Sequence, residues 1–183
     1  MTHRSSRYFS VAVGLLSSFL LLSAPDPLGC QEAEYDIKAE FLERFTRFIE
    51  WPSDSSVQDQ SVPFVIGLFD NPFGDYLASM AKERKIKGKP VEIRLLHAPD
   101  DVLGCNMVYI SASIADDDVA AILKLTADRS ILTVGDAPGM AEKGALINFY
   151  TTNDHVRFEI NKRAAERSGL KFSGRLLNLA LTK

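Results

Sequence analysis

Two aspartates stand where catalytic acids often lie in α/β proteins. Asp70 and Asp136 each follow a short apolar run that predicts a buried strand. Carboxylates at the ends of neighbouring strands can flank a common cleft and act as general acid and base, as an exported hydrolase would require. Aspartate at such places more often serves a turn or a helix cap. Hydrolysis by Asp70 or Asp136 is therefore a hypothesis, but the disfavoured one.

The residues that could act as nucleophiles lack the motifs that activate them. Ser111 and Ser113 follow an apolar run, but no G-x-S-x-G elbow surrounds them. Cys105 begins an apolar run, which is typical of a free thiol buried in a strand. Three aspartates at residues 116–118 open an expected helix, where negative charge complements the helix dipole. We therefore expect no catalytic residue and no enzymatic activity.

No residue pattern predicts a metal or a cofactor. Beyond the N-terminal segment the only histidines are His97 and His155, which lie far apart and form no H-x-x-H or H-E-x-x-H spacing. The chain also lacks the G-x-G-x-x-G and G-x-x-x-x-G-K-[ST] signatures of nucleotide-binding loops. We therefore expect neither a metal ion nor a cofactor.

One loop has the position of a small-ligand cleft. The sequence Asn-Pro-Phe-Gly at residues 71–74 separates an expected strand from an expected helix. Ligands of open α/β sheets bind beyond the carboxyl ends of strands, and the free N–H groups of the next helix can hold an anion. A cleft there would be lined by Asn71, Phe73, Gly74 and Asp136. The alternative is a tight turn built from Pro and Gly.

The elements that must position these residues alternate between strand and helix. Alternating or continuous apolar runs predict strands at residues 62–69, 91–95, 105–110, 131–134, 146–150 and 156–160. Periodic apolar residues predict helices at residues 33–50, 73–84, 115–125, 162–168 and 173–181. Residues 152–154 predict a hairpin between the last two strands. The order indicates an α/β fold: a three-layer α/β/α sandwich around a mixed sheet of about six strands.

The N-terminus has the pattern of an export signal. Arg4 and Arg7 precede an apolar run at residues 11–22, and Pro and Gly follow it. The run is too short to span a bilayer. We therefore expect a signal peptide over residues 1–30 with an open cleavage site, and one periplasmic domain over residues 31–183. The residues before Cys30 resemble a lipidation motif out of register, so a lipid anchor at Cys30 is the alternative to an unlipidated protein.

The charge of the mature chain excludes several partners. Loss of residues 1–30 would remove Arg4, Arg7 and Asp26 from 21 basic and 24 acidic residues, leaving a net charge of −4. No basic surplus is left for nucleic acid, and no cationic helix for anionic lipid. Protein and small-molecule partners remain.

The first expected helix carries an aromatic stripe. Its apolar positions Ile37, Phe41, Phe45 and Phe48 fall on one face, and charged residues that include Lys38 fill the other. Pro52 disfavours helix at Trp51 and ends it. Most of the stripe, namely Phe41, Phe45 and Phe48, is expected to be core. Because tryptophan is enriched at binding hot spots, Trp51 is the candidate interface residue of this helix, and Trp51→Ala would then weaken partner binding without unfolding the domain.

Several blocks, in order, resemble the YfiR family of periplasmic regulators. They include Phe-Ile-Glu-Trp-Pro at residues 48–52, Asp-Asn-Pro-Phe-Gly at 70–74, Gly-Cys-Asn-Met-Val-Tyr-Ile at 104–110, Gly-Ala-Leu-Ile-Asn-Phe at 144–149, Val-Arg-Phe-Glu-Ile-Asn at 156–161 and Arg-Leu-Leu-Asn-Leu-Ala at 175–180. The resemblance covers nearly the whole mature chain, and none of its blocks is catalytic.

The resemblance implies regulation. It implies an α/β/α sandwich that forms a homodimer and inhibits an inner-membrane diguanylate cyclase through the periplasmic sensor region of that enzyme. It also implies relief of inhibition by an outer-membrane lipoprotein, and so control of cyclic-di-GMP, biofilm and motility. The family's namesake depends on intradomain disulfides, whereas this chain has only Cys105 in the matching region. A small-solute sensor using the cleft near residues 71–74 is the main alternative function.

Overall fold

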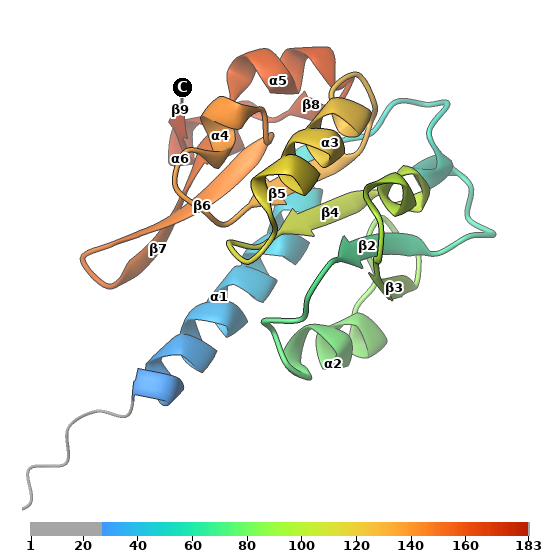
Figure 1. The fold of residues 1–183 in the computed structure, drawn as a ribbon. Helices are drawn as coiled ribbons and strands as arrows, with labels where there is room; N and C mark the ends of the chain where they lie inside the picture. Colours follow the sequence, from blue (N-terminus) through green and yellow to red (C-terminus); the bar gives the residue numbers. More distant parts are fainter. Residues whose placement is uncertain (1–26, 183) are drawn as a thin grey trace, which may run out of the picture.

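The computed structural model describes residues 27–182, with side chains over residues 31–180 (Figure 1). The predicted signal peptide lies outside the described residues except for residues 27–30. The side chain of Cys30, where a lipid anchor is the alternative to an unlipidated protein, also lies outside them. Within residues 27–182, no helix combines the length and the apolar character needed to cross a membrane.

The centre of the fold is a mixed seven-stranded sheet with strand order β3-β2-β4-β5-β6-β7-β9. Its strands are β2 (Phe64–Leu68), β3 (Val91–Leu95), β4 (Met107–Ile110), β5 (Leu132–Gly135), β6 (Ile147–Thr152), β7 (His155–Ile160) and β9 (Leu181–Thr182). The strands from β3 to β6 are parallel, whereas β7 runs antiparallel to β6. The predicted mixed sheet is confirmed, and the two-residue β9 adds a strand beside β7.

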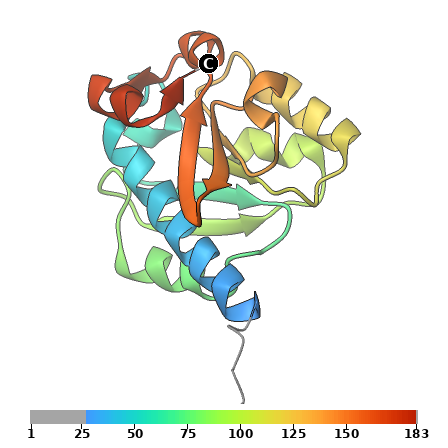
Figure 2. The same ribbon diagram turned by 90° about the vertical axis from the view of Figure 1, so that its left-hand side faces the viewer.

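Helices cover both faces of this sheet, which confirms the three-layer α/β/α sandwich (Figure 2). One face packs against α1 (Pro27–Phe48), α2 (Tyr76–Glu83), α5 (Lys162–Arg167) and α6 (Gly174–Leu179). The other packs against the 3₁₀ helix η2 (Pro99–Gly104), α3 (Asp116–Thr126) and α4 (Met140–Lys143). Side chains of β2 alternate between the two cores, since Ile66 joins the first and Val65 the second.

Helix α1 is longer at its start than the sequence predicts. It begins at Pro27 rather than near residue 33. Proline fits the first turn of a helix because the missing N–H would have no intrahelical partner there. The helix ends at Phe48, where the chain becomes β1 (Ile49–Glu50) and pairs with β8 (Lys171–Phe172). A 3₁₀ helix, η1 (Ser56–Gln58), follows in the connection to β2.

The hairpin predicted at residues 152–154 is confirmed, and the helix that follows it has a cap at each end. Asn153 and Asp154 join β6 to β7 with positive φ angles of 49° and 59°, as a two-residue hairpin turn requires. The side chain of Asn161 caps α5 by accepting the Ala164 N–H at 2.9 Å. Gly169 follows that helix with a φ of 76°.

Candidate functional site

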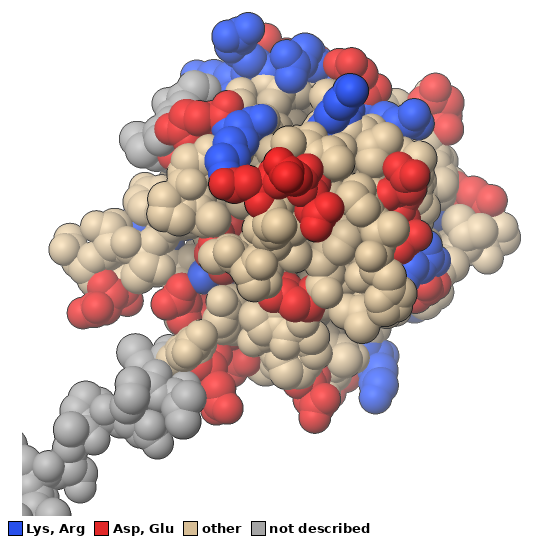
Figure 3. Space-filling view, viewed as in Figure 1, with Lys and Arg blue, Asp and Glu red and all other residues tan. Residues whose placement is uncertain are grey.

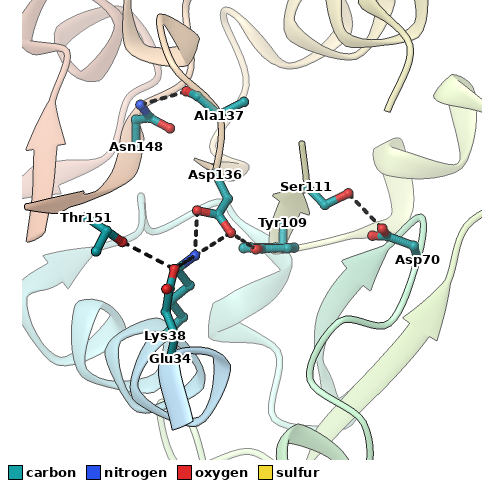
Figure 4. Close-up of polar contacts among 9 residues, drawn as sticks. All are labelled: Glu34, Lys38, Asp70, Tyr109, Ser111, Asp136, Ala137, Asn148 and Thr151. Carbon is teal, nitrogen blue, oxygen red and sulfur yellow. Dashed lines mark hydrogen bonds and ion pairs between the residues drawn. The ribbon is translucent and has the colours of Figure 1, made fainter. Parts of the chain in front are cut away.

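The polar residues singled out from the sequence gather at the carboxyl ends of the parallel strands. Asp70 follows β2, Ser111 follows β4 and Asp136 follows β5. The winding of the sheet reverses between β2 and β4, because β3 lies on one side of β2 and β4 on the other. Ligand crevices of open α/β sheets form at such a reversal. We call this region the carboxyl edge (Figure 4).

A buried lysine ties α1 to the carboxyl edge. Lys38 is only 3% exposed, which corrects its predicted place on the polar face of the helix. Its Nζ lies 2.8 and 2.7 Å from the two carboxylate oxygens of Asp136 and 2.6 Å from Glu34 Oε1 (Figure 4). Burial alone would lower the pKa of Lys38, but the hydrogen bonds to Asp136 and Glu34 outweigh it and raise the pKa. The lysine is therefore a charged anchor.

Aromatic rings surround this ion pair. The hydroxyl of Tyr109, a fully buried residue, donates to Asp136 Oδ2, and burial followed by the charge of Asp136 raises the pKa of Tyr109. The ring of Phe73 meets Tyr109 edge-to-face at 4.8 Å between centroids and Tyr35 at 5.7 Å. Phe73 and Asp136, two of the predicted cleft residues, therefore belong to one cluster connected through Tyr109.

The other two predicted cleft residues form a turn at the surface. The Asn71 Nδ2 donates to the Gly74 carbonyl at 2.8 Å. Gly74 has a φ of 54°, a left-handed conformation that favours glycine, and both residues are exposed. Asn71 and Gly74 thus form a tight turn, which is the arrangement considered as the alternative to a cleft.

A pocket of about 440 Å³ opens beside Asp136. Its walls include Asn148 of β6 and Glu159 of β7. The Asn148 Nδ2 donates to the Ala137 carbonyl at 3.1 Å and to Glu159 Oε1 at 3.0 Å. Sequence reasoning missed Asn148, Glu159 and Lys38. Asn148 and Glu159 could have been found from the sequence, because each is a polar residue inside an apolar strand whose neighbouring residues lie in the core.

The two aspartates considered for catalysis have separate partners. Asp136 accepts from Lys38 and Tyr109, whereas Asp70 accepts from Ser111 at 2.8 Å (Figure 4). Asp70 also accepts from Ser113 at 2.6 Å. Each carboxylate thus belongs to a hydrogen-bonded cluster of its own. This arrangement does not present a paired general acid and base in one cleft.

Trp51 lies in the core, which corrects its prediction as an interface residue. It is only 6% exposed, and its ring meets Phe64 edge-to-face at 5.5 Å. The indole Nε1 donates to the Ser130 carbonyl at 3.0 Å. A side chain with this burial and a satisfied donor stabilises the domain rather than a partner contact.

The remaining sites weighed from the sequence are at the surface. His97, His155 and the aspartates at residues 116–118 are exposed. Within the described part of the chain, no three His, Cys, Asp or Glu residues are grouped so as to hold a metal ion.

Cys105 is a free, buried thiol, as the sequence predicts. A Cβ atom added at Gly67 would lie 2.7 Å from Cys105 Sγ, so glycine provides the space for this thiol. Burial raises the pKa of Cys105 from 9.0 to about 11. Since the thiolate is the reactive form, the thiol is protected both by burial and by protonation.

We expect Cys105 to react slowly with a thiol reagent. At pH 8 the thiolate fraction of Cys105 should be about a hundredfold lower than that of a cysteine with the ordinary pKa. Burial also slows access of the reagent to the sulfur atom. The measurement is the rate of labelling by Ellman's reagent in a Cys30→Ser variant, which leaves only this thiol. The same variant unfolded in guanidinium should label rapidly, and equal rates in the two states would contradict the prediction.

A second surface, the α1–α6 groove, lies between α1 and α6, with Phe158 of β7 in its floor. Its volume is about 590 Å³. Its apolar floor comprises Phe41, Phe45, Phe48, Phe158, Leu176 and Leu179. Its charged rim comprises Glu40, Arg44, Arg47 and Arg84. Leu179 is 69% exposed, and the stripe residues Phe41 and Phe48 are only partly buried. The aromatic stripe of α1 is therefore part core and part surface.

Comparison with known proteins gives a family match over most of the chain. A family model described as YfiR/HmsC-like matches residues 35–181. No curated protein matches the chain in sequence. A solved structure titled as a conserved domain protein from Vibrio cholerae is 14% identical with a TM-score of 0.48, over 81% of this chain and 59% of that one. The chain thus spans under two thirds of that structure, and the likeness carries no functional argument.

Proposed function

The chain belongs to the YfiR/HmsC-like family, and on that premise we propose that it is a periplasmic regulator that binds and inhibits the sensor region of an inner-membrane diguanylate cyclase. The observation that carries the proposal is the extent of the family match, from residue 35 to residue 181. The proposal includes a homodimer in the periplasm and release of inhibition by an outer-membrane lipoprotein, as the sequence resemblance implies.

A non-enzymatic role agrees with the chemistry of the carboxyl edge. Asp136 is held by Lys38 and Tyr109, and Asp70 by two serine hydroxyls. Groups engaged in this way fix the relative positions of α1, β4 and β5. Such a rigid scaffold suits a domain that presents a surface to a partner.

The α1–α6 groove has the chemistry of a protein-binding surface. Its apolar floor would bury apolar side chains of the partner, and Arg44 and Arg47, each with a side chain 62% exposed, would meet acidic groups. Leu179 is exposed at one end of the floor. We therefore propose that the sensor region docks in this groove.

A deletion strain tests the regulatory function. Loss of the gene should raise cellular cyclic-di-GMP and surface attachment, because the cyclase loses its inhibitor. The wild-type gene should restore both. Unchanged cyclic-di-GMP, measured by mass spectrometry in the deletion strain, would count against the proposed regulation.

The groove is tested by complementing that strain with Leu179→Glu. A charge in the apolar floor should weaken binding of the purified sensor region by about tenfold or more, and the variant should fail to restore cyclic-di-GMP. Leu103→Glu is the matched control, because Leu103 is also exposed at 46% but lies in η2 on the opposite face of the sheet. Restoration by both variants, with equal melting temperatures, would place the interface elsewhere.

A second candidate is a periplasmic small-solute sensor. The observation that favours it is the pocket beside Asp136, where Asn148 and Glu159 supply further polar groups. A thermal-shift screen of small solutes would distinguish it, since a ligand that binds only the folded state raises the melting temperature.

A further inference from the structure

Three side-chain oxygens meet at the point where the winding of the sheet reverses. Ser111 Oγ lies 2.8 Å from Asp70 Oδ2, and Ser113 Oγ lies 2.6 Å from the same oxygen. The two hydroxyl oxygens are 2.8 Å from each other. The three atoms therefore form a closed triangle between the carboxyl ends of β2 and β4.

This triangle has too few protons for its contacts. Each serine hydroxyl carries one proton, and an ionised carboxylate carries none. Two protons can make linear hydrogen bonds in at most two of the three oxygen–oxygen contacts. Unless one proton is shared between two acceptors, the third contact brings lone pairs together at hydrogen-bond distance, and a positive charge beside the three oxygens would relieve this repulsion.

The second carboxylate oxygen of Asp70 also lacks a partner. Asp70 Oδ1 is buried and accepts no hydrogen bond within the described part of the chain. None of the ion pairs among the described residues includes Asp70, whereas Asp136 on the same edge is paired with Lys38. A buried carboxylate oxygen with no donor and no cation is costly.

The surroundings do not supply the missing positive charge. The single cation of Lys38 already faces two carboxylates, those of Asp136 and Glu34. Together with Asp70 the carboxyl edge therefore has an excess of negative charge. On the face drawn in Figure 3, acidic side chains are spread over the centre and lower part, and basic side chains gather at the top.

We propose that Asp70, Ser111 and Ser113 bind a small divalent metal ion, Ca²⁺ or Mg²⁺. Both ions take oxygen ligands that include carboxylates, and serine or threonine hydroxyls bind Mg²⁺ in phosphate-binding loops. With metal–oxygen distances of about 2.1 Å, one face of a Mg²⁺ octahedron has edges of about 3.0 Å, against 2.6–2.8 Å in the triangle, so the three oxygens would move apart slightly around Mg²⁺ and further around the larger Ca²⁺. Ser113 is exposed, so water would complete the coordination from that side. Asp70 Oδ1 would accept from a metal-bound water or join the ligands of Ca²⁺.

The ligand set explains why sequence patterns missed this site. It has one carboxylate and two hydroxyls, and the two serines lie 41 and 43 residues after Asp70 in the sequence. Known metal-binding motifs consist of closely spaced His, Cys, Asp or Glu residues, and this ligand set matches none of those motifs. Because only one ligand is charged, the dissociation constant should be weak, about 10⁻⁴–10⁻³ M, as in extracellular calcium modules. The site is independent of the proposed partner surface.

The test uses the mature protein treated with a chelator and dialysed. Calcium or magnesium chloride at about ten times the dissociation constant should raise the melting temperature by about 3–6 °C, and calorimetric titration should give one site. Asp70→Asn should abolish both effects. Ser113→Ala removes one exposed ligand and should weaken binding about tenfold. Because Ser113 is exposed, this variant should fold normally, and it therefore distinguishes loss of a ligand from a folding defect in Asp70→Asn.

Asp75→Asn is the matched control, because Asp75 is exposed five residues along the chain and makes no side-chain cap bond. It should bind the metal as the wild type does. Sodium chloride or methylammonium chloride at equal ionic strength should give no comparable shift. The proposal is overturned if the wild type does not respond to either divalent ion, if these salts act equally well, or if Asp70→Asn and Ser113→Ala bind like Asp75→Asn.

Discussion

Replacing Trp51 by alanine is expected to lower the free energy of unfolding by about 3–5 kcal/mol. The indole is almost fully buried, packs edge-to-face on Phe64 and donates to the Ser130 carbonyl. Its removal would leave a cavity between β2 and the end of α1, and the Ser130 carbonyl would lose its donor. Urea unfolding followed by circular dichroism measures the effect, because Trp51 is the only tryptophan and its fluorescence is lost in the variant.

Two further variants separate packing from hydrogen bonding at this position. Trp51→Phe retains most of the apolar volume but loses the indole N–H, so it should cost about 1–2 kcal/mol. Leu179→Ala, at a side chain 69% exposed, should change stability by less than about 0.5 kcal/mol. If Trp51→Ala instead unfolds like the wild type and binds the partner poorly, the original interface hypothesis stands and the core assignment fails.

Trp51 illustrates what local sequence cannot decide. A tryptophan just after an amphipathic helix fits a binding hot spot and a core position equally well, since both bury a large ring with a polar edge. The core position is fixed by Ser130, which lies 79 residues away and supplies the acceptor for the indole N–H. No sequence pattern within the helix predicts that contact.

The architecture was predictable because it depends on local periodicity. Apolar runs identified the strands, continuous in the central parallel strands and alternating in the edge strand β3. Asn161 and Gly169 bound α5 through cap geometry that needs only neighbouring residues. The carboxyl edge was partly predictable for the same reason, because Asp70 and Asp136 follow strands.

The composition of the carboxyl edge was not predictable, since it depends on how the strands are ordered. The neighbours β2 and β4 are separated in sequence by α2, β3 and η2, so nothing local places Ser111 beside Asp70. Lys38 was misplaced because helical periodicity assigns charged residues to solvent. That rule fails here because Asp136, 98 residues away, receives the ammonium group inside the fold.

Replacing Lys38 by methionine should destabilise the domain by about 3–5 kcal/mol. Methionine fills a similar volume, so packing is largely retained, but Asp136 would keep a buried charge without its cation. The double variant Lys38→Met/Asp136→Asn should recover much of this loss, because position 136 then carries no charge and its amide oxygen can still accept from Tyr109. Glu34 also loses its partner, but its side chain is 34% exposed, so water can solvate its carboxylate. Urea unfolding of the four proteins gives the coupling energy, expected to exceed about 1 kcal/mol.

An exposed ion pair provides the matched control for this cycle. Arg167 and Asp128 are 3.9 Å apart, with side chains 55% and 82% exposed. Arg167→Met and Asp128→Asn should each change stability by less than about 1 kcal/mol, and their coupling should be near zero because water screens the pair. A coupling as small as this for Lys38 and Asp136 would contradict the anchor role of Lys38.

The pH dependence gives an independent test of the same lysine. Because the hydrogen bonds to Asp136 and Glu34 raise the pKa of Lys38 above its ordinary value of 10.5, the folded state holds this proton more tightly than the unfolded state does. The stability from Lys38 is therefore fully present below pH 10.5 and is lost as the pH rises through the folded-state pKa. The difference in unfolding free energy between wild type and Lys38→Met should stay constant below that value and shrink above it. A difference that persists at higher pH would mean that the loss in Lys38→Met arises from packing and not from charge.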